Sequence, residues 1–386
     1  MTSISTPDEN TSIPSASTLQ TSWMATNTSF EASAPPTHDG TKSNHPKRSL
    51  EKRWMETLTD LVKESSDGNH CANSASVRDF LERWFAKISD LHTNMSTECD
   101  FDLGGGGSTR TMEKRHYHTL VHLDEMFGYI DVLVPHELLM LHHFNTTSPH
   151  ETATATVEEE TTISAQKMYD AVITLAVFFH DAIYNPKSST NEEDSVTLYK
   201  NFEAELLNCI HSSTDRGTSS STSLQVPLSA RPNSLELYSR HIQDFILATK
   251  SHTPTTTVLT EDETFTPSQL LHTVYQNIFL DADMAVLGKQ PNAYKQYAAL
   301  IRMEYNHVPH DVYCSKRADV LESFASSLST SYGGINSGSE GLANVEKTVF
   351  LTRTMKEAFE EYAIQNLREE IASLKRGEIP NNNGIK

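Results

Sequence analysis

Apolar side chains recur every three or four residues along most of this chain, which is the spacing of helices with one buried face. The first such segment begins near Lys47 and repeats Leu50, Trp54, Leu58 and Leu61. No segment alternates apolar and polar residues with a period of two, so the predicted class is all-α. The same spacing predicts further helices over residues 77–91, 112–134, 166–184, 190–210, 235–250, 267–287, 292–306, 317–328 and 345–374.

The segment 166–184 is apolar on nearly every side, which predicts a central, buried helix that Asn185–Pro186 would end. Its stretch AVFFHDAIY interrupts the apolar run with His180 and Asp181. A carboxylate buried without a partner costs several kcal/mol or shifts its pKa until it is neutral. An ion pair or a metal ion would satisfy Asp181, so the other half of such a site is expected elsewhere in the chain.

Polar stretches rich in Ser and Thr separate the predicted helices and have no period of their own. Such composition is typical of solvated or disordered segments, and GGGGS at 104–108 is typical of a flexible one. The predicted organisation is a disordered N-terminal tail at 1–46, a single helical domain at 47–376 and a flexible C-terminal tail at 377–386. Polar inserts within the domain are predicted near 100–111, 145–165, 211–233, 253–267 and 329–341.

The composition narrows the classes of function. Hydrophobic residues make up 37% of the chain, below the roughly 45–50% of an ordinary domain, which fits a normal core diluted by polar inserts. The formal net charge of −20 argues against a nucleic-acid-binding surface spread over the protein, and no nucleic-acid partner is predicted. The cysteines show no CxxC pattern, which disfavours a thiolate metal site and a disulfide scaffold.

Signals for targeting are weak. No stretch approaches the roughly 18–20 apolar residues that span a bilayer, so no membrane segment is predicted. The first 41 residues contain no Lys or Arg, which argues against a secretory signal and a mitochondrial presequence. The expected location is therefore cytoplasmic, although the Ser/Thr-rich tail is also compatible with a plastid transit peptide.

Histidines and aspartates on three predicted helices are the candidate metal ligands and catalytic residues. His116, His118 and His122 occur together, and a helix would place His118 and His122 on one face with a spacing that suits metal ligands. Surface helices use the same spacing without a metal, so these histidines alone leave both interpretations open. The adjacent His180 and Asp181 can equally be a core histidine and an aspartate bound by N–H groups.

The stretch FLDADMAVLG contributes two further carboxylates, which face different directions because they are two residues apart. Asp283 is the better candidate for the interior, whereas Asp281 is expected to be exposed or to contact the ligands indirectly. His252 follows the predicted helix 235–250 and is a fourth possible contributor. It can equally be a histidine favoured by the dipole at the end of that helix.

These candidates occur in the order His, then His-Asp, then a distant Asp, each on its own predicted helix. In this order the chain resembles the HD superfamily of metal-dependent phosphohydrolases. It is similar in particular to the subgroup with an RxYHxxxH helix. The resemblance spans residues 51 to about 375 and is carried in order by RHYHTLVHL (115–123), FFHDAIYNP (178–186), NEEDS (191–195), ILATKSH (246–252), FLDADMAVLG (279–288), YAALIRMEY (297–305), KRADVLESF (316–324) and YAIQNLREEI (362–371).

The resemblance implies an HD-domain-like helical bundle that holds a single divalent metal ion. It implies His118, His180, Asp181 and Asp283 as the ligands, and such ligands suit Mn, Mg, Fe or Zn. Two features depart from the subgroup: the long polar inserts, and Lys316 at a position where the family tends to have glycine. Neither departure falls on an implied ligand.

The implied activity is hydrolysis of a phosphate ester in a small phosphorylated substrate, such as a nucleotide. A divalent ion lowers the pKa of a bound water, which then attacks phosphorus. Asp181, His122 and His252 are the predicted catalytic residues. Asp181 would act as a ligand, and the two histidines would position the water or carry a proton.

Four further residues are predicted to bind substrate. Arg302 and Tyr305 are three apart on one helix face, and an arginine there could bind phosphate through two hydrogen bonds. The alternative for Arg302 is a surface ion pair with Glu304 or with another neighbouring carboxylate. Glu192 and Lys250 complete the set. Helix capping explains one of the neighbours Glu192 and Glu193, since Thr190-x-x-Glu193 has the form of a capping box, and Lys250 can simply be a helix C-terminal lysine.

Two other functions remain open at this level. A non-catalytic module would use the metal structurally or bind a nucleotide in the helical bundle. An HD-type di-iron oxygenase would need a second iron with additional ligands, for which His122, His252 and Asp281 are available. The sequence predicts no oligomeric state.

Overall fold

The computed structural model describes the helical part of the chain. The predicted N-terminal tail before residue 45, the GGGGS stretch and the C-terminal tail beyond residue 379 lie outside the described residues, as do most residues of the predicted inserts. The described residues are 45–65, 74–93, 98–99, 110–111, 114–146, 155–214, 233–254, 266–325 and 348–379.

Within these ranges the fold is all-α, which confirms the predicted class. The exception is one antiparallel pair of two-residue strands, β1 (Glu98–Cys99) and β2 (Arg110–Thr111). The helices are α2 (His45–Ser65), α3 (Ala75–His92), α4 (Leu120–Thr146), α5 (Ala155–Phe179), α6 (Asn191–Thr214), α7 (Asn233–Ala248), α8 (Pro267–Met284), the 3₁₀ helix η3 (Ala285–Gly288), α9 (Pro291–Glu304), α10 (His310–Ala325) and α11 (Arg353–Lys375).

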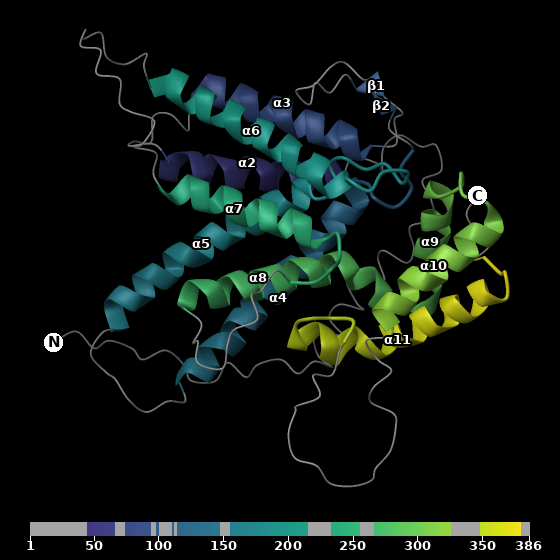
Figure 1. Cartoon of the computed structure of the whole chain (residues 1–386). Helices are drawn as coiled ribbons and strands as arrows, with labels where there is room; N and C mark the ends of the chain where they lie inside the picture. Colours follow the sequence, from purple (N-terminus) through teal and green to yellow (C-terminus); the bar gives the residue numbers. More distant parts are fainter. Residues whose placement is uncertain are drawn as a thin grey trace.

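Helix α5 is the centre of the bundle, as its apolar sequence predicts. It packs against α2, α4, α6, α7 and α8, and residues 172–179 are all buried. Figure 1 shows α2–α8 gathered in one bundle and α9–α11 grouped at its right-hand end. No helix in the described part of the chain combines the length and apolarity needed to cross a membrane.

The aromatic residues at the end of α5 anchor it to three other helices. Trp54 of α2 is fully buried, and its ring lies 5.1 Å from that of Phe178 and 5.4 Å from that of Phe202 on α6. The indole N–H of Trp54 donates to the carbonyl of Leu81 on α3 at 3.0 Å. This packing holds the C-terminal end of α5 in place before its polar residues begin.

Several predicted helix ends are wrong. The predicted insert 145–165 is mostly helical, because α4 continues to Thr146 and α5 already begins at Ala155. Helix α10 begins at His310 and not at residue 317. Helix α11 begins at Arg353 and not near residue 345, with Thr352 as its cap.

The group α9–α11 packs on the end of α8 through η3. Helix α11 contacts η3, α4 and α10, and the buried Gly288 at the end of η3 faces it. A Cβ atom at Gly288 would lie 2.6 Å from the Cβ atom of Phe359, so α11 can approach this closely only where a side chain is missing. Gly288 ends the predicted helix 267–287, whose last turn is a 3₁₀ helix.

Candidate metal centre

The candidate centre starts just beyond α5, whereas the sequence places it inside a helix. Helix α5 stops one residue before His180, and residues 180–184 form a turn. Ser195 Oγ accepts a hydrogen bond from the backbone N–H of Ile183 at 3.1 Å. Because a distant side chain satisfies this backbone, the chain can leave the helix, and His180 and Asp181 project from a turn at the buried helix end.

Arg115 joins this turn to the segment that carries His118. Its guanidinium is 1% exposed, and it donates to the carbonyls of His118 at 3.2 Å, Asp181 at 2.6 Å and Ala182 at 2.9 Å. Hydrogen bonds from a charged donor are among the strongest that a protein makes. Arg115 therefore fixes the relative position of two segments that each supply candidate ligands.

The predicted helix 112–134 begins only at Leu120, and residues 116–119 form bends. His116 and His118 therefore precede α4, and the prediction that His118 shares a helix face with His122 is wrong. The cause is a tertiary contact that captures the backbone N–H groups of this segment.

Glu304 of α9 makes that contact. Its Oε1 accepts from the backbone N–H groups of residues 116, 117 and 118 at 2.7, 2.8 and 3.2 Å. Its Oε2 lies 2.7 Å from Nδ1 of His118 and accepts from the Tyr184 hydroxyl at 2.9 Å. Facing a carboxylate, Nδ1 of His118 carries the proton, which leaves Nε2 free to bind a metal ion.

The pKa values of this pair shift in opposite directions. Burial raises the pKa of Glu304, but His118 and the backbone N–H groups outweigh burial and lower it to about 2. Burial lowers the pKa of His118, but Glu304 and Asp181 outweigh burial and raise it. In the protein without metal, both shifts favour the charged forms of the pair, a carboxylate and an imidazolium.

The structure brings the four implied ligands together. His180 Nε2 lies 3.2 Å from Asp181 Oδ2 and 3.8 Å from Asp283 Oδ1. His118 Nε2 lies 4.0 Å from Asp181 Oδ2. These side chains come from the segment before α4, the turn after α5 and the end of α8, so they meet only in the folded chain.

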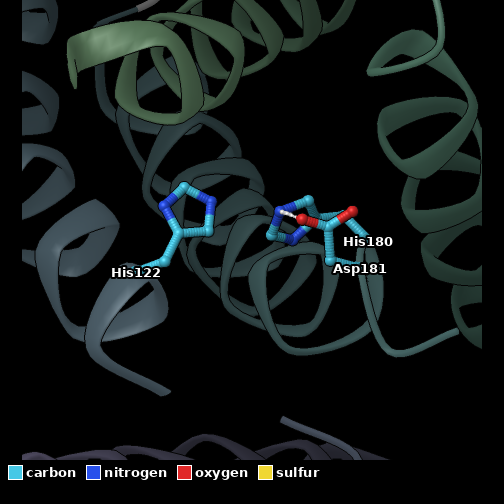
Figure 2. Close-up of side chains that lie close together, drawn as sticks. All are labelled: His122, His180 and Asp181. Carbon is cyan, nitrogen blue, oxygen red and sulfur yellow. Dashed lines mark ion pairs between the residues drawn. The ribbon is translucent and has the colours of Figure 1, made fainter. Parts of the chain in front are cut away.

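His122 of α4 also lies in this group. His122, His180 and Asp181 form a buried cluster that could hold a metal ion, since one ligand atom from each lies within 4.8 Å of the others. Figure 2 shows His122 on its own helix beside His180 and Asp181, with the Asp181 carboxylate turned toward the His180 ring. His122 Nε2 is in addition 3.1 Å from Asp283 Oδ1.

His252 reaches the same aspartate from the other side. Its Nε2 lies 3.1 Å from Asp283 Oδ2, so His252 is not merely a histidine at a helix end. It is the one non-glycine residue of the described chain with a positive φ, at 50°. Such a conformation is uncommon outside glycine, and strained backbone of this kind concentrates at functional sites.

The atoms of His180 test whether this group fits a metal ion. Its Nδ1 lies 2.9 Å from the carbonyl of Val177 and donates to it, so Nε2 is the atom that can bind a metal ion once it has lost its proton. That Nε2 is buried and has no hydrogen-bond partner among the described residues, although it faces the oxygens of Asp181 and Asp283. A cation among these three acceptors satisfies all of them, and mixed imidazole and carboxylate ligands suit a divalent metal.

The electrostatics of the cluster favour a cation as well. Burial lowers the pKa of His180, but Asp181 and Asp283 outweigh burial and raise it to about 9. Burial raises the pKa of Asp181, but His180 and His118 hold it well below the usual range. Burial also raises the pKa of Asp283, but its hydrogen bonds with His122 and His252 outweigh burial and lower that pKa. Both carboxylates are therefore ionised and attract positive charge.

Asp281 takes no part in this group, which corrects the expectation that it is exposed or close to the ligands. It is 1% exposed, and its carboxylate accepts from the N–H of Leu351 and from the N–H and hydroxyl of Thr352, each at 2.7 Å. Asp281 thus secures the start of α11. Burial raises the pKa of Asp281 to about 7, although these hydrogen bonds oppose the rise.

Two of the predicted substrate-binding residues lie at the end of α9. Arg302 donates to the carbonyls of Tyr305 and Val308, at 3.1 Å for Val308, and its guanidinium lies 4.5 Å from the ring centre of Tyr313. It therefore closes the helix end, and among the described residues Arg302 forms no ion pair with Glu304 or another carboxylate, which the alternative interpretation required. Tyr305 is half-buried, and the structure gives neither residue a contact with the candidate ligands.

The other two lie beside the start of α6. Lys250 pairs with Glu193 and donates to the carbonyl of Ser189 at 3.0 Å. Glu192 is half-buried, and burial raises its pKa, with Lys250 opposing and Asp181 adding to the rise. Glu192 is thus the predicted substrate-binding residue that is electrostatically coupled to the centre.

Sequence reasoning missed three residues that shape the centre: Glu304, Arg115 and Tyr184. The ring of Tyr184 lies 4.2 Å from that of His118. All three residues lie inside the stretches that carry the family resemblance, and this position is the sequence feature that could have pointed to them. Polar residues in otherwise apolar helix ends, such as Glu304 in IRMEY, are candidates for such contacts.

The fold and this cluster define an all-helical protein with buried histidines and aspartates that could hold a metal ion. Beyond that class, no family model, no curated protein and no solved structure matches the chain.

Proposed function

We propose that this protein is a metal-dependent phosphohydrolase, of the kind found in the HD superfamily, which acts on a small phosphorylated substrate. The observation that supports the proposal is the buried Nε2 of His180, which lies 3.2 Å from a carboxylate oxygen of Asp181 and 3.8 Å from one of Asp283. The order of ligands in the sequence and their convergence point in the same direction.

In this proposal His118, His180, Asp181 and Asp283 hold a divalent ion. When bound, such an ion supplies a Lewis acid and lowers the pKa of a coordinated water. Glu304 keeps His118 in the tautomer that can bind metal, through the 2.7 Å contact with Nδ1.

The remaining histidines have different places in this proposal. His122 is 2% exposed and lies close enough to His180 and Asp181 to serve as a ligand itself. The side chain of His252 is 25% exposed and bonded to Asp283, so it connects the buried centre with solvent. His252 is therefore the better group to carry a proton to or from the reacting water.

The test combines metal analysis with phosphate release on a panel of nucleotides and other phosphate esters. The wild-type protein should contain about one metal ion per chain at the centre and should release phosphate. Asp181→Ala should lose both properties. Asp281→Asn is the matched control, because this buried aspartate contacts α11 and not the centre, and it should keep the metal and the activity.

Three results would count against the proposal. Full turnover by Asp181→Ala would end the catalytic assignment. Bound metal without turnover of any phosphate ester would support a non-catalytic module. Two irons together with oxygen consumption would support a di-iron oxygenase, and the convergence of His122 and His252 on Asp283 makes this the second candidate function.

A further inference from the structure

A second group of histidines and aspartate lies between α7 and α8. His241 and Asp244 are three residues apart on α7 and so share a face, and His272 comes from α8. One ligand atom from each of the three lies within 4.8 Å of the others. The two imidazole rings are 4.6 Å apart between centroids, at an interplanar angle of 45°.

Two ring nitrogen atoms in this second group lack a hydrogen-bond partner among the described residues. Nδ1 of His241 and Nδ1 of His272 are both buried and have no hydrogen-bond partner among the described residues. Nε2 of His241 lies 3.4 Å from the hydroxyl of Tyr169, which itself donates to the carbonyl of Ser268 at 3.2 Å. A buried polar atom without a partner costs free energy, so two of them side by side indicate a missing ligand.

The charge state of the histidines suits a metal ion. Burial lowers the pKa of His241 to about 4, with His272 and Arg240 adding to the effect, and burial also lowers the pKa of His272. Both shifts favour the neutral imidazole, which is the form that coordinates metals. Asp244 contributes the carboxylate beside them.

This group is separate from the candidate centre. His272 and Asp283 are eleven residues apart on α8 (283 − 272), which is about 16 Å along the axis and three turns on nearly the same face. The two groups thus lie at different levels along α8. Figure 1 shows α7 and α8 next to each other beside α5, which carries Tyr169.

We propose that His241, Asp244 and His272 bind a divalent transition-metal ion of the zinc class, which joins α7 to α8 as a structural site. Two imidazoles and one carboxylate are a ligand set that zinc uses, with the fourth position left to water or another oxygen. All three residues are half-buried, so an ion can reach them from solvent. The inference does not depend on the proposed phosphohydrolase activity.

Zinc and cobalt are the probes, and the full-length protein is used after chelation and dialysis. The wild type should bind one zinc ion more than His272→Gln or His241→Gln. Each substitution should raise the dissociation constant of zinc at this site at least 100-fold. Cobalt bound at this site should give visible absorption bands that both variants lack. His136→Gln, a half-buried histidine elsewhere that contacts Thr354, is the matched control and should bind like the wild type.

A second measurement separates this site from the candidate centre. Zinc should raise the melting temperature of Asp181→Ala, in which the other centre is impaired, but the rise should be smaller in Asp181→Ala combined with His272→Gln. Asp244→Asn, which keeps the size of the side chain, should reduce the rise as well. Equal zinc content and an equal rise in all these variants would overturn the proposal, provided that circular dichroism shows them folded.

Discussion

Glu304 illustrates how much of the centre depends on a single residue. One carboxylate accepts three backbone N–H groups and the His118 ring, and thereby sets the shape of a segment 186–188 residues away in the chain. Without it, the N–H groups of residues 116–118 would lose their partner and His118 would be free to rotate. Glu304 is consequently a positioning residue for a ligand.

Glu304→Gln should weaken metal binding about 10–100-fold, because the amide no longer fixes the His118 ring as a carboxylate does. In the metal-free protein the pKa of Glu304 is lowered from 4.5 to about 2, which corresponds to about 3 kcal/mol of stability. A depressed carboxyl pKa stabilises the fold above pH 4.5, and that stability is lost as the pH falls toward 2. Urea unfolding of the variant should therefore depend less on pH in this range.

Glu370→Gln is the control for this substitution, since Glu370 is a buried carboxylate that binds Arg317 and Tyr294 away from the centre. It should change stability but leave the metal dissociation constant unchanged. Equal metal affinity in the Glu304 and Glu370 variants would contradict the positioning role.

Arg115→Met should destabilise the protein by about 3 kcal/mol, because three carbonyls at buried or partly buried positions lose a charged donor. Urea unfolding of the metal-free protein measures this change. Arg376→Met is the control, since Arg376 lies exposed beside Glu378, and its unfolding midpoint should match that of the wild type. A similar midpoint for both variants would show that Arg115 does not hold the two segments together.

At the scale of elements, helix ends supply more of the candidate centre than helix middles do. The candidate ligands lie in the bends before α4, in the turn after α5 and on the last turns of α8. The packing of η3 on α11 closes this end of the bundle, and it requires a residue without a side chain at position 288.

Gly288→Ala should destabilise the fold by about 2 kcal/mol, because the new Cβ would lie 2.6 Å from that of Phe359 and force η3 and α11 apart. Gly128→Ala is the matched substitution, in the middle of α4, where a Cβ atom meets nothing within 4 Å. It should stabilise the protein by about 0.5–1 kcal/mol through the better helix propensity of alanine. Thermal and urea unfolding would compare the two variants, and the changes in the free energy of unfolding should have opposite signs.

At the scale of the whole molecule, a metal ion at the centre would connect segments that lie far apart in the chain. His118 and Asp283 are 165 residues apart (283 − 118), so a bound ion stabilises only the complete fold. Binding of a ligand to the folded state alone raises the apparent stability in proportion to the logarithm of its concentration.

Chelation of the metal should therefore lower the melting temperature. Restoring the metal at 100 times its dissociation constant should raise the free energy of unfolding by about 2.7 kcal/mol. Calorimetry with and without chelator measures this. In Asp181→Ala the change should be smaller, and what remains would belong to the group His241, Asp244 and His272. If the chelator leaves the wild-type melting curve unchanged, no metal stabilises the fold.

The sequence by itself determined the all-α class, the central place of α5 and the residues that can serve as ligands. The class and the place of α5 follow from local periodicity. The candidate ligands follow from the cost of burying a charge such as Asp181 and from the resemblance to the HD superfamily. Only the tertiary structure decided where the helices end around the ligands and what orients them. Residues 116–118 leave the helix because Glu304 captures their N–H groups, and the turn at 180–184 is held by Arg115 and Ser195. Such long-range hydrogen bonds override local helix propensity, and no local pattern of residues encodes them.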